Sequence, residues 1–139
     1  MAFLYFSKKI GKAMKRYLSM IKFSHTIFAL PFAILGFTLG SLSSGDTIDW
    51  ILFAYVLLCM IFARSAAMSF NRYIDRDIDE ANPRTAVREI PSGVISPKSA
   101  LLFTLFNCLA FVVVTALINS ICFYLSPVAL AVVLGYSYT

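Results

Sequence analysis

Residues 49–79 read DWILFAYVLLCMIFARSAAMSFNRYIDRDID, an apolar run that passes directly into a dense cluster of ions. The apolar part is long enough to cross a bilayer, which takes about 20 residues. Nothing from Asp49 to Ala81 breaks a helix, and Pro83 disfavours helical dihedrals at the residue before it, so the helix should end near Asn82. The stretch therefore predicts a membrane span whose charged end projects from the bilayer.

The rest of the chain has the composition of a membrane protein. Its 139 residues are 60% hydrophobic and 14% charged, with a mean hydropathy of +0.81, whereas soluble domains carry about 25% charged residues. The predicted fold class is an all-α membrane protein with a tight hairpin between the third and fourth helices. The four predicted transmembrane helices cover about 24–42, 49–70, 99–118 and 121–138.

Basic residues lie on one side of this topology. They precede the first span and populate residues 71–98, whereas the 42–49 loop has only Asp46 and Asp49 as charges. The positive-inside rule then places the N-terminus and 71–98 in the cytoplasm, for a multi-pass protein of the cell inner membrane. The net charge of +5 suits anionic lipid head groups. Nucleic acid is excluded as a partner because no soluble domain is available to bind it.

The chain divides into a basic N-terminal segment, 1–21, and a membrane domain, 22–139. The first is either a short amphipathic helix on the cytoplasmic surface or a solvated basic leader. Local signals predict four features of the membrane domain. A GxxxG step at Gly36 and Gly40 predicts a close helix approach, and Pro31 predicts a kink. A short helix is predicted at 84–89, within the cytoplasmic loop that follows the charged cluster (the motif loop), and Ser96 with Pro97 predicts a capped start of the third span.

Asn71, Asp75 and Asp79 are four residues apart, so on a helix they share one face and climb it by about 6 Å per step. They offer only oxygen ligands, the set that Mg²⁺ prefers, and Mg²⁺ commonly binds through one or two carboxylates plus substrate phosphate. Asp77 points to the other side. The alternative is a solvated helix end whose carboxylates pair with neighbouring arginines.

Arg64 is the one formal charge inside the second span. It lies seven residues before Asn71, so it continues the same face about 10 Å deeper and extends a polar groove into the bilayer. Arg84 and Arg88 can offer forked donors to phosphate. The alternatives are a structural ion pair for Arg64 and a topological role for the loop arginines. Lys22 and His25 stand at the entrance of the first span.

The run NRYIDRDIDEANPRTAVREIPSG, residues 71–93, resembles the UbiA family of intramembrane aromatic prenyltransferases, in its 4-hydroxybenzoate polyprenyltransferase-like branch. The likeness extends to KFSHTIFALPFAILG and to the final LGYSYT, and covers nearly the whole chain from about residue 20. It implies about nine helices around a cavity that opens to lipid. It also implies Mg²⁺-dependent transfer of a polyprenyl group from a polyprenyl diphosphate to an aromatic acceptor such as 4-hydroxybenzoate, in ubiquinone or menaquinone biosynthesis.

The resemblance also assigns residues. Asp75 and Asp79 would be catalytic, and with Asn71 they match the first of two aspartate motifs that hold magnesium. The positions that match diphosphate contacts are Arg64, Arg72, Arg76, Arg84 and Arg88, and those near the aromatic acceptor are Lys22 and His25.

A second aspartate motif is absent from this sequence, so the chain resembles an N-terminal portion that is inactive alone and works with a separate C-terminal half. Four spans do not enclose the cavity that the family builds. Two other classes stay open: a non-catalytic membrane fragment, and a small cation or proton carrier that uses Arg64 and the carboxylates.

Overall fold

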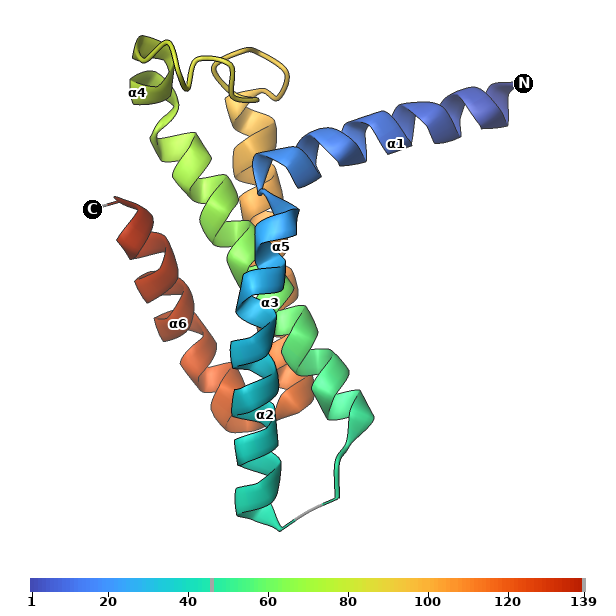
Figure 1. Ribbon diagram of the computed structural model, residues 1–139, viewed down its shortest axis with the longest axis vertical. Coiled ribbons are helices and arrows are strands. Elements are labelled where there is room, and N and C mark those ends of the chain that lie inside the picture. The colour runs from blue at the N-terminus through green and yellow to red at the C-terminus, as the bar shows by residue number, and fades with distance from the viewer. Residues whose placement is uncertain (46, 139) are drawn as a thin grey trace.

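The computed structural model describes residues 1–45 and 47–138; Asp46, in the predicted acidic loop, and Thr139, in the final LGYSYT run, lie outside the described residues. Every regular element in the described part is helical. In chain order these are α1 (Ala2–Met20), the 3₁₀ helix η1 (Phe23–Ala29), α2 (Leu30–Ser44), α3 (Trp50–Ile74), α4 (Arg76–Ala81), α5 (Pro97–Ile118) and α6 (Ser120–Tyr138), as Figure 1 shows.

Four helical segments are long and apolar enough to span a bilayer, and each overlaps one predicted span. They are Phe23–Ser44, Trp50–Ile74, Pro97–Ile118 and Ser120–Tyr138. The expected hairpin is present at Asn119, whose extended backbone ends α5 and whose side-chain oxygen accepts from the Cys122 amide at 2.7 Å. An Asn at this position satisfies an amide that the first turn of α6 leaves free. The all-α membrane fold is confirmed.

Helices α3 and α5 make the most extensive contact, and α6 packs against both. A buried polar chain joins α3 to α5: Thr104 Oγ1 donates to Ser69 Oγ at 2.9 Å, and Ser69 Oγ donates to the Ala100 carbonyl at 3.0 Å. Small polar residues at such a crossing let the backbones approach and hydrogen-bond in an apolar medium. These bonds fix the register of the pair that carries the charged segment.

Helix α2 contacts α3 more lightly. The close approach at its GxxxG step stays a prediction, and the kink predicted at Pro31 is wrong. A Cβ built at Gly36 or Gly40 meets no described atom within 4 Å, so the GxxxG step makes no close helix approach within the described chain. Pro31 lies in the first turn of α2, directly after the 3₁₀ segment. Proline lacks an amide hydrogen and fits a helix start, so here it begins the α-helix and does not kink it.

A sharp corner joins α1 to the first span. Lys22 has φ 47° and ψ 58°, and it is the one non-glycine residue with positive φ among those described. The left-handed conformation costs a non-glycine residue about 1 kcal/mol or more. Here two backbone bonds hold it, Lys22 N to Ser19 O at 3.0 Å and His25 N to Lys22 O at 2.8 Å. The corner turns the chain, so α1 extends sideways from the bundle (Figure 1).

The predicted single helix from 49 to 81 is interrupted. Asp75 has ψ 2°, so α3 ends at Ile74 and α4 forms a separate short helix. The sequence has no breaker there; the departure accompanies a long-range contact of Asp79, described below. The helical end at Asn82 is as predicted, with an extended backbone.

The loop after Asn82 folds as successive turns, so the short helix predicted at 84–89 is wrong. Its last residue, Ser96, caps α5 as predicted, accepting from the Ser99 amide at 3.2 Å, and Pro97 is the first helical residue.

The loop is anchored by a small apolar core at the α4 end of the bundle. Ile90 and Ile95 are buried against Met20, the last residue of α1, against Ile21, which follows it, and against Ala100 of α5. Tyr17 adds a stacked ring contact with Phe103, 4.9 Å between centroids. Hydrophobic burial therefore brings together segments that are about 70 residues apart in the sequence.

Ile90→Ala should destabilise this end of the fold by about 2–4 kcal/mol, because it opens a cavity in a buried cluster. Thermal unfolding can be followed through the exposure of the half-buried thiols of Cys59, Cys108 and Cys122. Ile78→Ala is the matched control, since Ile78 is 72% exposed on α4. Equal shifts in the two variants would contradict the anchoring role of Ile90.

Candidate functional site

A cleft of about 730 Å³ opens where α1, η1, α3 and the loop meet. The cleft is lined by Lys22, His25, Arg72, Arg84 and Arg88. These are five of the residues that the family resemblance assigned to substrate binding. Four of them are cations. Such a concentration of positive charge at one opening attracts and focuses an anionic ligand.

Arg72 forms the back of this cleft. It is only 6% exposed, and its Nε donates to the carbonyl oxygen of Met20 at 3.5 Å. That carbonyl belongs to the end of α1, where helical carbonyls lack partners in the helix. Arg72 thus joins α3 to the corner before the first span and holds a guanidinium beside Lys22.

Asp79 and Arg88 form the central ion pair of the site. Arg88 Nη1 donates to Asp79 Oδ1 at 2.6 Å, and the carboxylate side chain is 7% exposed against 32% for the guanidinium. Thr85 Oγ1 adds a bond to the Asp79 carbonyl at 3.0 Å. These contacts fold the loop back onto α4 and orient Arg88 toward the cleft. Asp79 Oδ2 is buried and has no hydrogen-bond partner among residues 1–45 and 47–138.

Asn71, Asp75 and Asp79, the predicted magnesium ligands, keep part of their predicted helical geometry. Asp75 N donates to Asn71 O at 3.0 Å and Asp79 N to Asp75 O at 2.8 Å, so helical steps link the three residues in spite of the altered ψ at Asp75. Asn71 and Asp75 are half-buried and Asp79 is buried, whereas Asp77 is exposed, as predicted. The residues 1–45 and 47–138 contain no cluster of three His, Cys, Asp or Glu side chains close enough to hold a metal.

A magnesium ion that binds through two carboxylates and substrate phosphate still fits this donor set. The unpartnered oxygen of Asp79 is the relevant observation, because an unpaired buried carboxylate oxygen is costly unless a donor or cation reaches it. Asn71 and Asp75 precede Asp79 by two and one backbone-bonded turns and also carry hard oxygen atoms.

Two predicted phosphate ligands lie outside the cleft lining. Arg76 is occupied locally: its Nη1 donates to the Tyr73 carbonyl at 2.7 Å, its guanidinium lies 4.6 Å from the Tyr73 ring centre, and its Nε is 3.6 Å from Asp77. Arg64 is half-buried deeper in α3, and its buried Nε has no hydrogen-bond partner in the described part of the chain. A cation within a membrane span normally faces a cavity or a partner.

Ser19 and Glu89 belong to the cleft but were not predicted. Ser19 Oγ donates to Glu89 Oε1 at 2.5 Å, which ties the end of α1 to the loop. The two residues are 70 positions apart, and no periodicity or motif spacing relates them. Glu89 also places one negative charge among the cations and so limits their mutual repulsion.

The comparison with known proteins bears on this geometry. The profile of the UbiA prenyltransferase family matches residues 29–139. The chain belongs to this family. The match covers α2 through α6, including the Asn71–Asp79 triplet and the loop that carries Arg84 and Arg88.

Several UbiA relatives are similar over much of the chain. A protoheme IX farnesyltransferase of Cronobacter sakazakii is 33% identical over 122 residues, covering 87% of this chain and 40% of the relative. A 4-hydroxybenzoate octaprenyltransferase of Thiobacillus denitrificans is 37% identical over 98 residues, 70% of this chain and 33% of the relative. The chain therefore spans less than half the length of these relatives.

A solved structure shares the fold. The apo structure of a UbiA homolog from Aeropyrum pernix K1 aligns with a TM-score of 0.74 and 33% sequence identity. The alignment covers 83% of this chain and 40% of the homolog. The helical arrangement is thus that of part of a UbiA protein, and the chain is an integral membrane protein.

A double-mutant cycle on Asp79 and Arg88 tests the central ion pair. Arg88→Ala should cost about 2 kcal/mol, because it leaves a buried carboxylate without its donor, and Asp79→Ala/Arg88→Ala should cost less than the sum of the single changes. Unfolding in mixed micelles gives the free energies. The Arg76 and Asp77 pair is the control, because its carboxylate is 80% exposed and its two charged groups are 3.6 Å apart, so the expected coupling is below about 1 kcal/mol. Additive effects at Asp79 and Arg88 would contradict the pair.

Proposed function

We propose that this chain forms the prenyl diphosphate side of an intramembrane aromatic prenyltransferase. The observation that carries the proposal is the cleft in which Lys22, Arg72, Arg84 and Arg88 meet beside the buried carboxylate of Asp79. The membership of the chain in a prenyltransferase family supports the same ligand class.

A diphosphate matches the chemistry of the cleft walls. Arginine guanidinium groups bind phosphate oxygens through parallel hydrogen bonds. Arg72 is fixed by its bond to Met20, and Arg88 by its bond to Asp79, so two of the cations need little reordering when the ligand arrives. Preorganised donors of this kind stabilise negative charge that develops on a leaving group.

Asn71, Asp75 and Asp79 would hold Mg²⁺ on the other side of the diphosphate. Bound there, the ion would neutralise charge on the leaving group. Asp75 and Asp79 are the proposed catalytic residues in this sense, and Arg64 and Arg76 are proposed further diphosphate contacts. The prenyl tail would lie along the apolar helices.

The proposed reaction breaks the bond between C1 of the prenyl group and the diphosphate oxygen, and forms a bond from C1 to a ring carbon. The ring then loses a proton, and diphosphate leaves. The acceptor that we propose is a phenolic acid such as 4-hydroxybenzoate, in quinone biosynthesis, as the name of the Thiobacillus denitrificans relative suggests. Lys22 and His25, both exposed on the cleft, would receive its carboxylate.

A second candidate acceptor is protoheme IX. It is favoured by the protoheme farnesyltransferase relative, whose match covers more of this chain. Either reaction would involve residues beyond these four spans, since the curated relatives are more than twice as long. We therefore propose that the site is completed by a further C-terminal half, that the cleft faces the cytoplasm of an inner-membrane protein, and that residues 1–21 form a separate segment.

Binding of farnesyl diphosphate to the chain in lipid nanodiscs tests this function without any acceptor. Arg84→Ala should weaken binding about tenfold in isothermal titration, because it removes one charge-assisted hydrogen bond from an exposed side chain. Lys98→Ala is the control, since Lys98 is also exposed but does not line the cleft. An absence of binding to the unaltered chain would favour a non-catalytic membrane fragment. Ion flux through liposomes without any prenyl ligand would favour a carrier.

Asp75→Ala and Asp79→Ala should remove the dependence of this binding on Mg²⁺. In the unaltered chain the affinity should rise when Mg²⁺ is added, because the ion screens the carboxylates from the diphosphate. Asp77→Ala, on the exposed side of α4, should keep the full response. A normal magnesium response in both Asp75→Ala and Asp79→Ala would overturn the metal assignment. In the presence of the proposed C-terminal half, both variants should lose prenyl transfer.

A further inference from the structure

Helix α1 leaves a long apolar surface without a protein partner in the described chain. It projects sideways from the bundle at the end that carries α4 and the motif loop (Figure 1). Its large apolar side chains are exposed, with 82% for Phe3 and 63% for Phe6. Most of the stability of a helix in a protein comes from packing of its amphipathic face, so a surface that covers this face would add to the stability of α1.

The side chains of α1 divide into two opposite faces. At about 100° per residue, the apolar and the basic residues each occupy an arc of about 120°, and the two arcs are centred on opposite sides of the helix. The apolar arc holds Phe3, Phe6, Ile10, Met14 and Leu18, with Leu4 about 40° beyond its edge, and the basic arc holds Lys8, Lys9, Lys12, Lys15 and Arg16. All of these residues are exposed.

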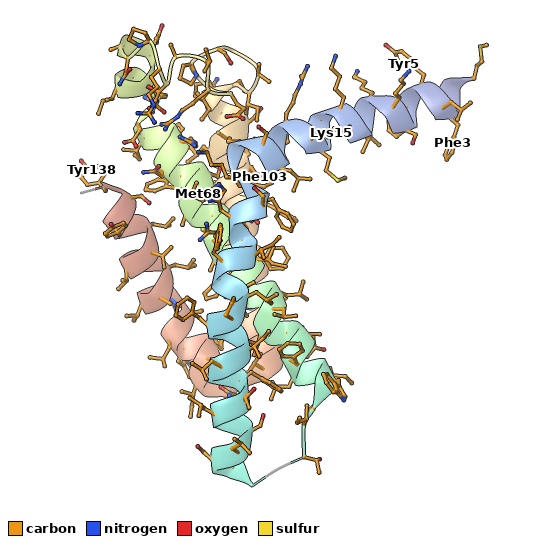
Figure 2. The ribbon with its side chains drawn as sticks, viewed as in Figure 1. Phe3, Tyr5, Lys15, Met68, Phe103 and Tyr138 are labelled. Carbon is orange, nitrogen blue, oxygen red and sulfur yellow. The ribbon has the colours of Figure 1, made fainter. Side chains whose placement is uncertain are left out.

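The direction of these faces relative to the bundle indicates what covers them. In Figure 2, Phe3 points to the side of α1 along which the membrane helices run, and Tyr5 and most of the nitrogen-tipped side chains point to the opposite side. In a bilayer crossed by those helices, the apolar arc would therefore face the hydrocarbon and the basic arc the head groups and water.

We propose that α1 lies in the plane of the membrane interface and binds anionic phospholipid head groups. Phe3, Phe6 and Ile10 enter the boundary of the acyl chains, and the five cations contact lipid phosphates from above. The side-chain charges within α1 are all positive, which selects an anionic over a zwitterionic surface.

The contacts between α1 and the cleft walls link the depth of α1 in the membrane to the depth of the cleft. The Lys22 corner, the Ser19 to Glu89 bond and the Arg72 to Met20 bond all hold the last turn of α1 to the cleft walls. A membrane-bound α1 therefore sets the cleft opening at the level of the lipid head groups.

Hydrogen exchange of the whole chain in nanodiscs tests the proposal. The amides of α1 should exchange more slowly in discs with phosphatidylglycerol than in discs of phosphatidylcholine alone, and salt should reduce the difference because it screens surface charge. Each cation near an anionic surface is worth about fivefold in binding, so Lys8→Gln/Lys9→Gln/Lys12→Gln together should lower α1 protection in anionic discs by up to about a hundredfold. The amides of α3 and α5 should not change.

Two controls distinguish lipid binding by α1 from other causes of its protection. Lys98→Gln removes an exposed cation from the start of α5, outside α1, and should leave α1 protection intact. The salt series on the unaltered chain needs no variant. Equal protection of α1 in neutral and anionic discs would overturn the proposal. So would protection that appears only when two copies share a disc, because the apolar face would then be covered by another chain.

Discussion

The bond between Arg88 and the buried carboxylate of Asp79 is the interaction on which the site depends. The motif loop has no regular structure of its own, and without a long-range contact its turns would have many arrangements. This ion pair, with Thr85 on the Asp79 carbonyl, returns the loop to α4 and places Arg84 and Arg88 opposite Lys22 and Arg72. The apolar contacts of Ile90 and Ile95 then fix the rest of the loop against the end of α1.

The sequence predicted the membrane helices well, because their signal is local. Twenty apolar residues in succession need a bilayer, and caps such as Ser96 and Asn119 act over three or four residues. The same locality explains the errors. The turns at 84–89 accompany contacts with Asp79 and with the end of α1 that no sequence period connects. The open surface at Gly36 and Gly40 depends on which helix is available to fill it. The interruption at Asp75 has no signal in the sequence.

Prediction of the site was partial for a related physical reason. Helical spacing predicted that Asn71, Asp75 and Asp79 lie at successive turns, which their backbone hydrogen bonds keep, and charge alone marked Arg84 and Arg88 as candidates. The sequence alone did not show that Asp79 is bound to Arg88 or that Arg76 contacts Tyr73 and Asp77. Nor did it show that Arg72 holds the end of α1. The contacts of Arg76 are local but depend on its rotamer, whereas those of Arg72 and Arg88 come from the packing of the loop and of α1, which gathers the cations into one cleft and leaves one oxygen of Asp79 without a hydrogen-bond partner among the described residues.

The central claim is that the arginines of this cleft hold a diphosphate, and magnetic resonance in bilayers tests it directly. With arginine side chains labelled with nitrogen-15 and farnesyl diphosphate added, distance-dependent dephasing between nitrogen-15 and phosphorus-31 should place guanidinium nitrogens at hydrogen-bond distance from the diphosphate. Arg84→Ala should reduce this signal, and Arg16→Ala, on the basic face of α1, should leave it unchanged. Equal loss in both variants, or a diphosphate signal without any dephasing, would contradict the account.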